Sequence, residues 1–242
     1  MKIARLALLL SLAGLLLLLA GGPGYRLGFW GLGFGLLDAM RYALYLGAAG
    51  ALLGAVFLLV PATRRQQLAG LAAAIVIGVG VAAVPIQIRA IAEKVPPIHD
   101  ITTDTEDPPR FVAIRALRES SPNPPEYGGS EIAEQQRQAY PELGPLDTDE
   151  DAETVFDEAL SAASDQGWEI VATAPEQGRI EATATTLWYG FKDDIIIRIQ
   201  SRDDGARVDV RSKSRVGRSD LGANAARIER YLDSLRRQLE KT

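Results

Sequence analysis

The sequence predicts an α-helical transmembrane region followed by a soluble α+β domain, in which helices flank a four-stranded antiparallel sheet. Three apolar runs near the N-terminus each approach the roughly 20 residues that a helix needs to cross a bilayer. Charge changes sharply after them: residues 1–91 hold seven basic side chains and one acidic one, whereas residues 92–242 hold nineteen and thirty. A net charge of +6 followed by −11 indicates a boundary between two solvent environments.

The apolar runs cover residues 3–21, 39–60 and 68–88. A helix suits each of them, because it satisfies its own backbone hydrogen bonds in lipid. The first run also has the basic start and leucine-rich body of a secretory signal peptide, but its end matches a small-x-small cleavage site poorly. We therefore expect an uncleaved helix, with a cleaved signal as the alternative. The aromatic segment 25–31 is typical of the headgroup layer and predicts an interfacial loop or a re-entrant turn.

The charge of the short loops predicts an orientation. Lys2 and Arg5 precede the first run, and Arg64 and Arg65 lie between the second and third runs. Basic residues in short loops stay on the cytoplasmic side of a membrane. We therefore expect a bacterial inner-membrane protein with a cytoplasmic N-terminus and with residues 92–242 in the periplasm.

Three regions follow from these patterns. Residues 1–91 are the three-helix transmembrane region, 92–146 a proline-rich connector packed on the domain, and 147–242 the extracytoplasmic α+β domain. Proline removes a backbone donor and restricts its neighbour, so we expect the connector to be extended. Within it, residues 111–117 can form a short strand or a helical turn.

Regular patterns begin after the connector. Thr148 or Asp149 is expected to cap a helix that ends at Gly167. A final helix is predicted from Asp220 to near Glu240, because its apolar residues recur in steps of three and four. Strand-like runs joined by turn residues predict hairpins between these helices. The four runs are residues 168–173, 179–187, 194–201 and 207–214.

Composition excludes several classes of function. The acidic second half argues against bulk binding of nucleic acid, whose phosphates need a basic surface. The chain has no cysteine, which excludes disulfides, thiol catalysis and cysteine-ligated metals. We find no phosphate-binding glycine loop, nucleophile elbow or zinc spacing, so we predict no cofactor and no metal. The carboxylates within residues 100–107 are of the kind that Ca²⁺ binds, but a solvated acidic loop is preferred.

The sharpest candidate site is basic. Alternation along residues 207–215 places charged side chains on one strand face, and Arg198 joins them from the neighbouring strand. The start of the final helix adds free amides, which favour anions. This face can bind a phosphate, a carboxylate or an anionic lipid headgroup, or it can be a solvated face paired with Asp193, Asp194 and Asp209. The candidate anion-binding residues are Arg198, Arg211, Lys213, Arg215, Arg218 and Ser219.

Two further groups of residues carry side chains that are able to act in catalysis or in partner binding. His99 is the only histidine, and Asp100 follows it. A base oriented by a carboxylate is conceivable, but no nucleophile accompanies the pair, and hydrogen bonds that fix the extended segment are preferred. Trp188, with Tyr189 and Phe191, is either core or a stacking edge for a partner, and core is preferred.

Four separated motifs occur at residues 98–104, 167–169, 188–194 and 211–224. They resemble the uncharacterised family called domain of unknown function 1499, and the resemblance covers about residues 95–240. The resemblance implies a bacterial envelope or organellar protein with membrane helices ahead of the domain, and it implies no activity. The motif residues of structural or functional interest are His99, Asp100, Asp104, Trp188, Asp193, Asp194, Asp220 and Asn224.

Three hypotheses for function follow. The first is a non-enzymatic docking or assembly factor, whose partners are the lipid bilayer and another membrane or envelope protein. The second is binding of an anionic lipid or a small anionic ligand at the basic strand face. The third is a hydrolase that uses His99, which we rank last because no complete catalytic set accompanies it.

Overall fold

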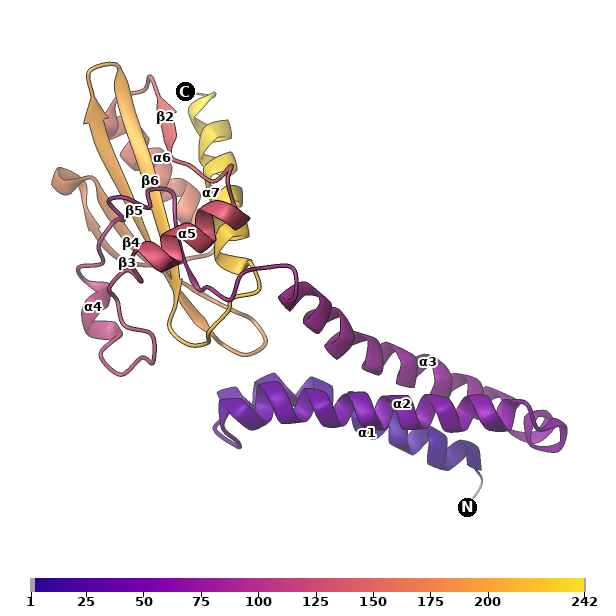
Figure 1. Cartoon of the computed structure of the whole chain (residues 1–242). Helices are drawn as coiled ribbons and strands as arrows, with labels where there is room; N and C mark the ends of the chain where they lie inside the picture. Colours follow the sequence, from indigo (N-terminus) through magenta and orange to yellow (C-terminus); the bar gives the residue numbers. More distant parts are fainter. Residues whose placement is uncertain (1–2, 242) are drawn as a thin grey trace. The chain divides into compact units, whose positions relative to one another are not determined.

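Three long apolar helices form the N-terminal part of the chain in the computed structural model, which describes residues 3–241 (Figure 1). They are α1 (Ile3–Arg26), α2 (Ala39–Leu58) and α3 (Pro61–Ala92). A π-helical turn, η1 (Gly33–Asp38), leads into α2. Each helix is long and apolar enough to cross a membrane, α2 being counted together with η1. The prediction of three long apolar helices is confirmed.

The helix ends differ from the sequence prediction in places. The second apolar run was expected to span residues 39–60, and α2 ends two residues earlier, at Leu58. Pro61 opens α3, because proline suits the first turn of a helix. The long α3 contains a break at Gln67, where φ is −132°. The aromatic segment 25–31 begins inside α1, which continues to Arg26 before the chain turns. Lys2 lies outside the described residues.

Small residues bring the helices close together. A Cβ added to Gly47 would lie 2.8 Å from the carbonyl oxygen of Gly78, so only glycine fits there without a shift. The hydroxyl of Ser11 donates to the carbonyl oxygen of Ala74 at 2.8 Å. Close backbone approach and interhelical hydrogen bonds of this kind hold helices together in lipid.

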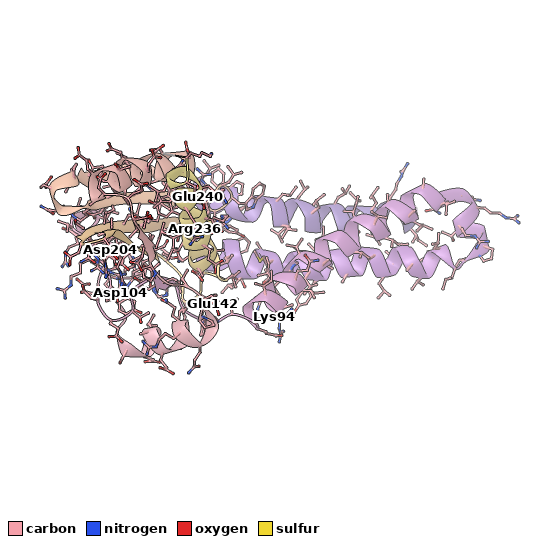
Figure 2. The ribbon with its side chains drawn as sticks, turned by 90° about the horizontal axis from the view of Figure 1, so that it is seen from above. Lys94, Asp104, Glu142, Asp204, Arg236 and Glu240 are labelled. Atoms are coloured by element: carbon pink, nitrogen blue, oxygen red, sulfur yellow. The ribbon has the colours of Figure 1, made fainter. Side chains whose placement is uncertain are left out.

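The chain divides into two units, Met1–Glu93 with Leu187–Gly190 and Lys94–Thr186 with Phe191–Thr242. Figure 2 shows side-chain nitrogen and oxygen atoms concentrated on the second unit and sparse along the helices. This distribution follows the charge boundary of the sequence.

The second unit contains an antiparallel sheet of six strands in its described residues. The order is β1-β6-β5-β4-β3, and β2 also pairs with β6. The strands are β1 (Asp100–Thr102), β2 (Leu146–Thr148), β3 (Glu169–Ala174), β4 (Arg179–Thr185), β5 (Lys192–Arg202) and β6 (Gly205–Ser214). The prediction of four strands is therefore wrong. Strand β1 lies in the connector and β2 at the boundary between the connector and the following domain. Both pair along one edge of β6, and three residues are too few to show alternation.

One face of the sheet is apolar and packs against two helices, α6 (Ala152–Asp165) and α7 (Ala223–Leu239) (Figure 1). Trp168 and Tyr231 stack in this core with ring centroids 5.1 Å apart. The α6 cap is Asp151, whose carboxylate accepts hydrogen bonds from the backbone of residues 153 and 154. The expected caps, Thr148 and Asp149, are wrong because Thr148 ends strand β2.

Residues 104–118 of the connector contact the opposite face of the sheet, whereas Ile98 and Ile101 belong to the apolar core. The connector is not uniformly extended, because it contains β1, the helical turn α4 (Ile114–Leu117) and the helix α5 (Ser130–Ala139), and its last residue begins β2. The buried carboxylate of Glu181 on β4 accepts hydrogen bonds from the backbone amides of residues 112–114, each at 3.0 Å. A side chain of the sheet therefore holds the start of α4 in place.

Candidate functional site

Strand β6 separates charged and apolar side chains as the alternation predicts. Val208 and Val210 lie in the apolar core, whereas Asp209, Arg211 and Lys213 are buried on the opposite face. A buried charge needs a partner of opposite sign or a set of hydrogen bonds. The partners of this strand come from the connector and from β5.

Asp100 at the start of β1 binds two cations of β6. Its carboxylate accepts two hydrogen bonds from Arg211, at 2.8 and 2.9 Å, and lies 3.0 Å from the Lys213 ammonium nitrogen. The Arg211 guanidinium lies between the rings of Phe111 and Tyr127, 4.9 and 5.4 Å from their centroids. Two parallel hydrogen bonds and two aromatic faces fix this guanidinium.

Asp194 on β5 forms a second centre. Its fully buried carboxylate lies 2.7 Å from Arg118 of the connector and 2.8 Å from Arg215. The Thr183 hydroxyl donates to it at 2.7 Å. Burial lowers the pKa of Arg118, although the charge of Asp194 opposes that shift.

Asp209 forms the third centre. It binds Arg198 of β5 at 3.0 Å and Arg207 at 3.1 Å, and Arg198 also reaches Asp104 and Asp107. Burial opposes ionisation of Asp104, but backbone N–H groups of the following loop and the charge of Arg198 lower the pKa of its carboxyl group. The predicted candidates Arg198, Asp104 and Asp209 thus meet in one network.

Asp193 lies on the apolar face of the sheet, where it binds a side chain of α7. Its carboxylate forms an ion pair with Arg227. Asn224 accepts a hydrogen bond from Ser212 at 2.6 Å and donates one to Ser214 at 3.0 Å. These polar groups attach the first turns of α7 to β5 and β6.

His99 and Asp100 have separate partners. The Nδ1 atom of His99 is 3.3 Å from the Arg218 carbonyl oxygen, whereas Asp100 binds Arg211 and Lys213. Neighbouring residues of an extended chain point to opposite sides, so the two side chains do not act as a base and its orienting carboxylate. The structural role preferred for these two residues stays a prediction.

The start of α7 satisfies its own amides. Asp220 accepts hydrogen bonds from the backbone N–H groups of Gly222 and Asn224, at 2.8 and 2.9 Å. The Ser219 hydroxyl accepts one from the amide of residue 221 at 3.3 Å. The exposed Arg218 remains on this loop. Two of the amides that were expected to favour an external anion are therefore already engaged by the Asp220 carboxylate.

Trp188 lies in the loop Leu187–Gly190, outside the cores of the second unit, and 44% of it is exposed. The preference for a core position is not supported by this exposure. The hypothesis that it is a stacking edge for a partner stays a prediction.

Sequence reasoning missed three residues of this face, Arg118, Glu181 and Tyr127. Arg118 follows a short helical turn, and its partner Asp194 is 76 residues away. Glu181 lies in β4 among residues that are buried on both sides. The only sequence signal for any of these three residues was the carboxylate of Glu181, whose immediate neighbours along the strand are apolar.

A groove of about 580 Å³ lies away from these centres, between α6, β5 and the short helix η2 (Pro175–Gln177). Its lining includes three exposed carboxylates, Glu153, Asp157 and Glu176, and two buried apolar side chains, Phe156 and Ile199. No basic side chain is among its described lining residues. We call this feature the acidic groove.

These observations define a class of protein: three apolar helices joined to an antiparallel sheet whose charged face is covered by the preceding connector. A family model described as "Protein of unknown function (DUF1499)" matches residues 100–235. The match covers more than half of the 242 residues, and the chain belongs to this family. The predicted resemblance is thereby confirmed. No curated protein matches the chain.

Proposed function

We propose that the chain is a membrane-anchored, non-enzymatic docking protein that binds a positively charged segment of another membrane or envelope protein in the acidic groove. The observation that carries this proposal is the lining of the groove. Three carboxylates, Glu153, Asp157 and Glu176, line it together with the apolar side chains of Phe156 and Ile199.

The chemistry of the groove fits lysine and arginine side chains. Their aliphatic stems pack on apolar surface while their charged ends meet carboxylates. Complementary charge also speeds the encounter with the correct partner and disfavours acidic ones. The net charge of −11 over residues 92–242 acts in the same direction over longer distances.

The proposal includes a location and an orientation. Three helices able to cross a membrane support anchoring. The basic residues Lys2, Arg5, Arg64 and Arg65 support a cytoplasmic N-terminus, with the second unit in the periplasm of a bacterial inner membrane. Because the chain has no cysteine, a single Glu142→Cys change reports this directly. The proposal requires labelling by a membrane-impermeant maleimide once the outer membrane is opened.

The docking proposal is tested by site-specific crosslinking on the full chain. A photo-crosslinker on Gln177→Cys lies in the groove lining, and mass spectrometry identifies the attached segment. We expect one membrane or envelope protein, joined through a lysine- or arginine-rich segment. The triple variant Glu153→Gln, Asp157→Asn, Glu176→Gln in the same background should reduce the crosslink at least about tenfold.

A matched control removes the same charge elsewhere. The change Glu119→Gln, Glu131→Gln, Glu142→Gln alters three exposed connector carboxylates outside the groove and should leave the crosslink intact. If both triple variants lose the crosslink equally, the loss is due to the change in net charge, which would contradict docking in the groove. A crosslinked segment without basic residues would contradict it as well.

Binding of an anionic lipid or small anion is the second candidate function. The observation that favours it is the surplus of buried cations around Asp100 and Asp194. The strand-face residues Arg198, Arg211, Lys213 and Arg215 already bind internal carboxylates. An external anion is therefore held by the surplus charge of the whole cluster and not by a free strand face.

A further inference from the structure

The charges buried around Asp100 and Asp194 do not balance. Two carboxylates, Asp100 and Asp194, face four cations, and the side chains of all six are at most 15% exposed. The four cations are Arg118, Arg211, Lys213 and Arg215. Two positive charges are thus left over in a region where an uncompensated charge is costly.

Backbone carbonyl groups and the Thr183 hydroxyl, and not acids, accept the remaining hydrogen bonds of these cations. Arg211 donates to the carbonyl oxygens of Pro109 and Pro125, at 3.1 and 3.0 Å, and Arg118 donates to that of Asn123 at 2.9 Å. A carbonyl group satisfies a donor but does not cancel its charge. Among the described residues, the Nε atom of Arg118 is buried with no partner at all.

A cavity of about 270 Å³ lies against this cluster, and we call it the connector cavity. Arg110, Arg115 and Arg211 line it together with a single carboxylate, Glu126, so its lining is also net positive. Arg115 and Glu126 form an ion pair at 3.1 Å, and Arg110 is exposed. The cavity is slightly smaller than the usual range for ligand pockets, about 300–1,000 Å³, and so suits a small ligand.

Tyr127, one of the residues that line the connector cavity, carries an unused hydrogen-bond donor. Phe111 lines the same cavity, and the buried hydroxyl of Tyr127 has no hydrogen-bond partner among the described residues. Burial, reinforced by the charge of Asp100, raises the pKa of Tyr127 to about 12. The hydroxyl is therefore protonated at neutral pH and is able to donate to an anion.

We propose that the connector cavity binds a small organic oxyanion, a carboxylate or a phosphate monoester, through Arg110, Arg115 and the Tyr127 hydroxyl. The ligand charge offsets the surplus of buried cations, and the Phe111 and Tyr127 rings contact its apolar part. The inference rests on the second candidate function and is independent of the acidic groove. A free metabolite and an anionic lipid headgroup share this chemistry, and the experiment distinguishes them.

The test follows thermal unfolding of the full chain in phosphatidylcholine nanodiscs. Benzoate, glycerol 3-phosphate and inorganic phosphate are compared with chloride at equal ionic strength. A ligand that binds only the folded chain raises Tm in proportion to its occupancy. We expect benzoate or glycerol 3-phosphate to raise Tm, and Tyr127→Phe and Arg110→Gln each to weaken binding about tenfold.

Two features keep the variants interpretable. Tyr127→Phe removes an unpaired buried hydroxyl and keeps the ring, so the unliganded variant should unfold at or above the wild-type temperature. Arg230→Gln removes an exposed arginine of α7, outside the cavity lining, and should bind like the wild type.

In a second experiment, phosphatidylglycerol replaces phosphatidylcholine in the nanodiscs and no soluble anion is added. Stabilisation that Tyr127→Phe abolishes assigns a lipid headgroup, whereas stabilisation by soluble anions alone assigns a free ligand.

Two results would overturn the proposal. Equal stabilisation of the wild type, Tyr127→Phe and Arg110→Gln would place anion binding outside the connector cavity and leave the second candidate function standing. If neither an oxyanion nor phosphatidylglycerol stabilises the chain more than chloride does, both the connector-cavity proposal and the second candidate function are contradicted.

Discussion

The two faces of the sheet in the second unit are built from the same strands and are covered in different ways. On one face, Ile195, Ile197 and Val208 pack against α6 and α7 in an apolar core. On the other, Asp194 and Asp209 bind arginines and lie beneath a connector that precedes them in sequence. Alternation along the strands produces this separation, because successive side chains point to opposite faces.

The difference teaches how each cover is specified. Apolar burial depends on area and is insensitive to direction, so a helix with an apolar stripe is sufficient. Ion pairs and hydrogen bonds require particular partners at particular distances, and breaking one leaves a buried charge. The charged face therefore selects one path for the proline-rich connector, which also buries Phe111 and Ile114 against Ile196. It should also be more sensitive to single substitutions than the apolar face.

The largest expected effect is at Asp194. Asp194→Asn leaves Arg118 and Arg215 without their common carboxylate, and removing one partner of a buried ion pair destabilises a protein by about 3–5 kcal/mol. The matched change on the apolar face, Ile197→Val, should cost about 1 kcal/mol. Chemical unfolding of the full chain in detergent measures both. A loss at Asp194 no larger than that at Ile197 would contradict the comparison.

A smaller effect is expected at Asp104, with a defined dependence on pH. Its ion pairs with Arg198 and Arg207 are partly exposed, so Asp104→Asn should cost about 1 kcal/mol or less at neutral pH. The pKa of Asp104 in the folded chain lies below its ordinary value of 3.8. The ionised Asp104 carboxylate therefore makes its full contribution to folding stability at pH values above 3.8. That contribution is lost as the pH falls through the lower pKa of the folded state.

The pH dependence is checked by unfolding the wild type and Asp104→Asn across the acid range. The difference in their stability should be constant near neutral pH and should shrink below 3.8. A difference that grows as the pH falls would show that the carboxyl group is stabilised in its protonated form, which contradicts the network described here.

The smallest effect is expected on the apolar side, at the cap of α6. Asp151→Ala removes the acceptor for the first amides of the helix and should lower stability less than Asp194→Asn does. Asp149→Ala is the control, because Asp149 was the alternative cap suggested by the sequence and accepts no hydrogen bond from the first turn of α6. Unequal far-ultraviolet circular dichroism melts separate the two variants. Identical melts would show that the cap contributes nothing.

The sequence was informative where patterns are long. Strands β3 to β6 and helices α6 and α7 extend over enough residues for alternation or helical periodicity to appear, and each lies close to its predicted range. Strands β1 and β2 hold three residues each and depend on the edge of β6, so local pattern gives no signal for them. The α6 cap was displaced because Thr148 is used by β2.

The candidate site was predicted in part for the same reason. Alternation on β6 correctly grouped Arg211 with Lys213, since that depends only on the strand itself. Their shared partner Asp100 lies 111 residues before Arg211, and Arg118 lies 76 residues before Asp194. Such pairings depend on the path of the connector, and its sequence has no helical or strand periodicity from which that path can be predicted.

Hydrogen exchange at the backbone amides of residues 112–114 tests most directly whether the connector is an integral layer of the domain. These amides donate to the buried carboxylate of Glu181. We predict that they exchange as slowly as the amides of β5, and that Glu181→Gln accelerates them while α6 and α7 remain protected. Fast exchange at 112–114 in the wild-type chain, at the rate of a solvated loop, would contradict the account and make the connector a tether.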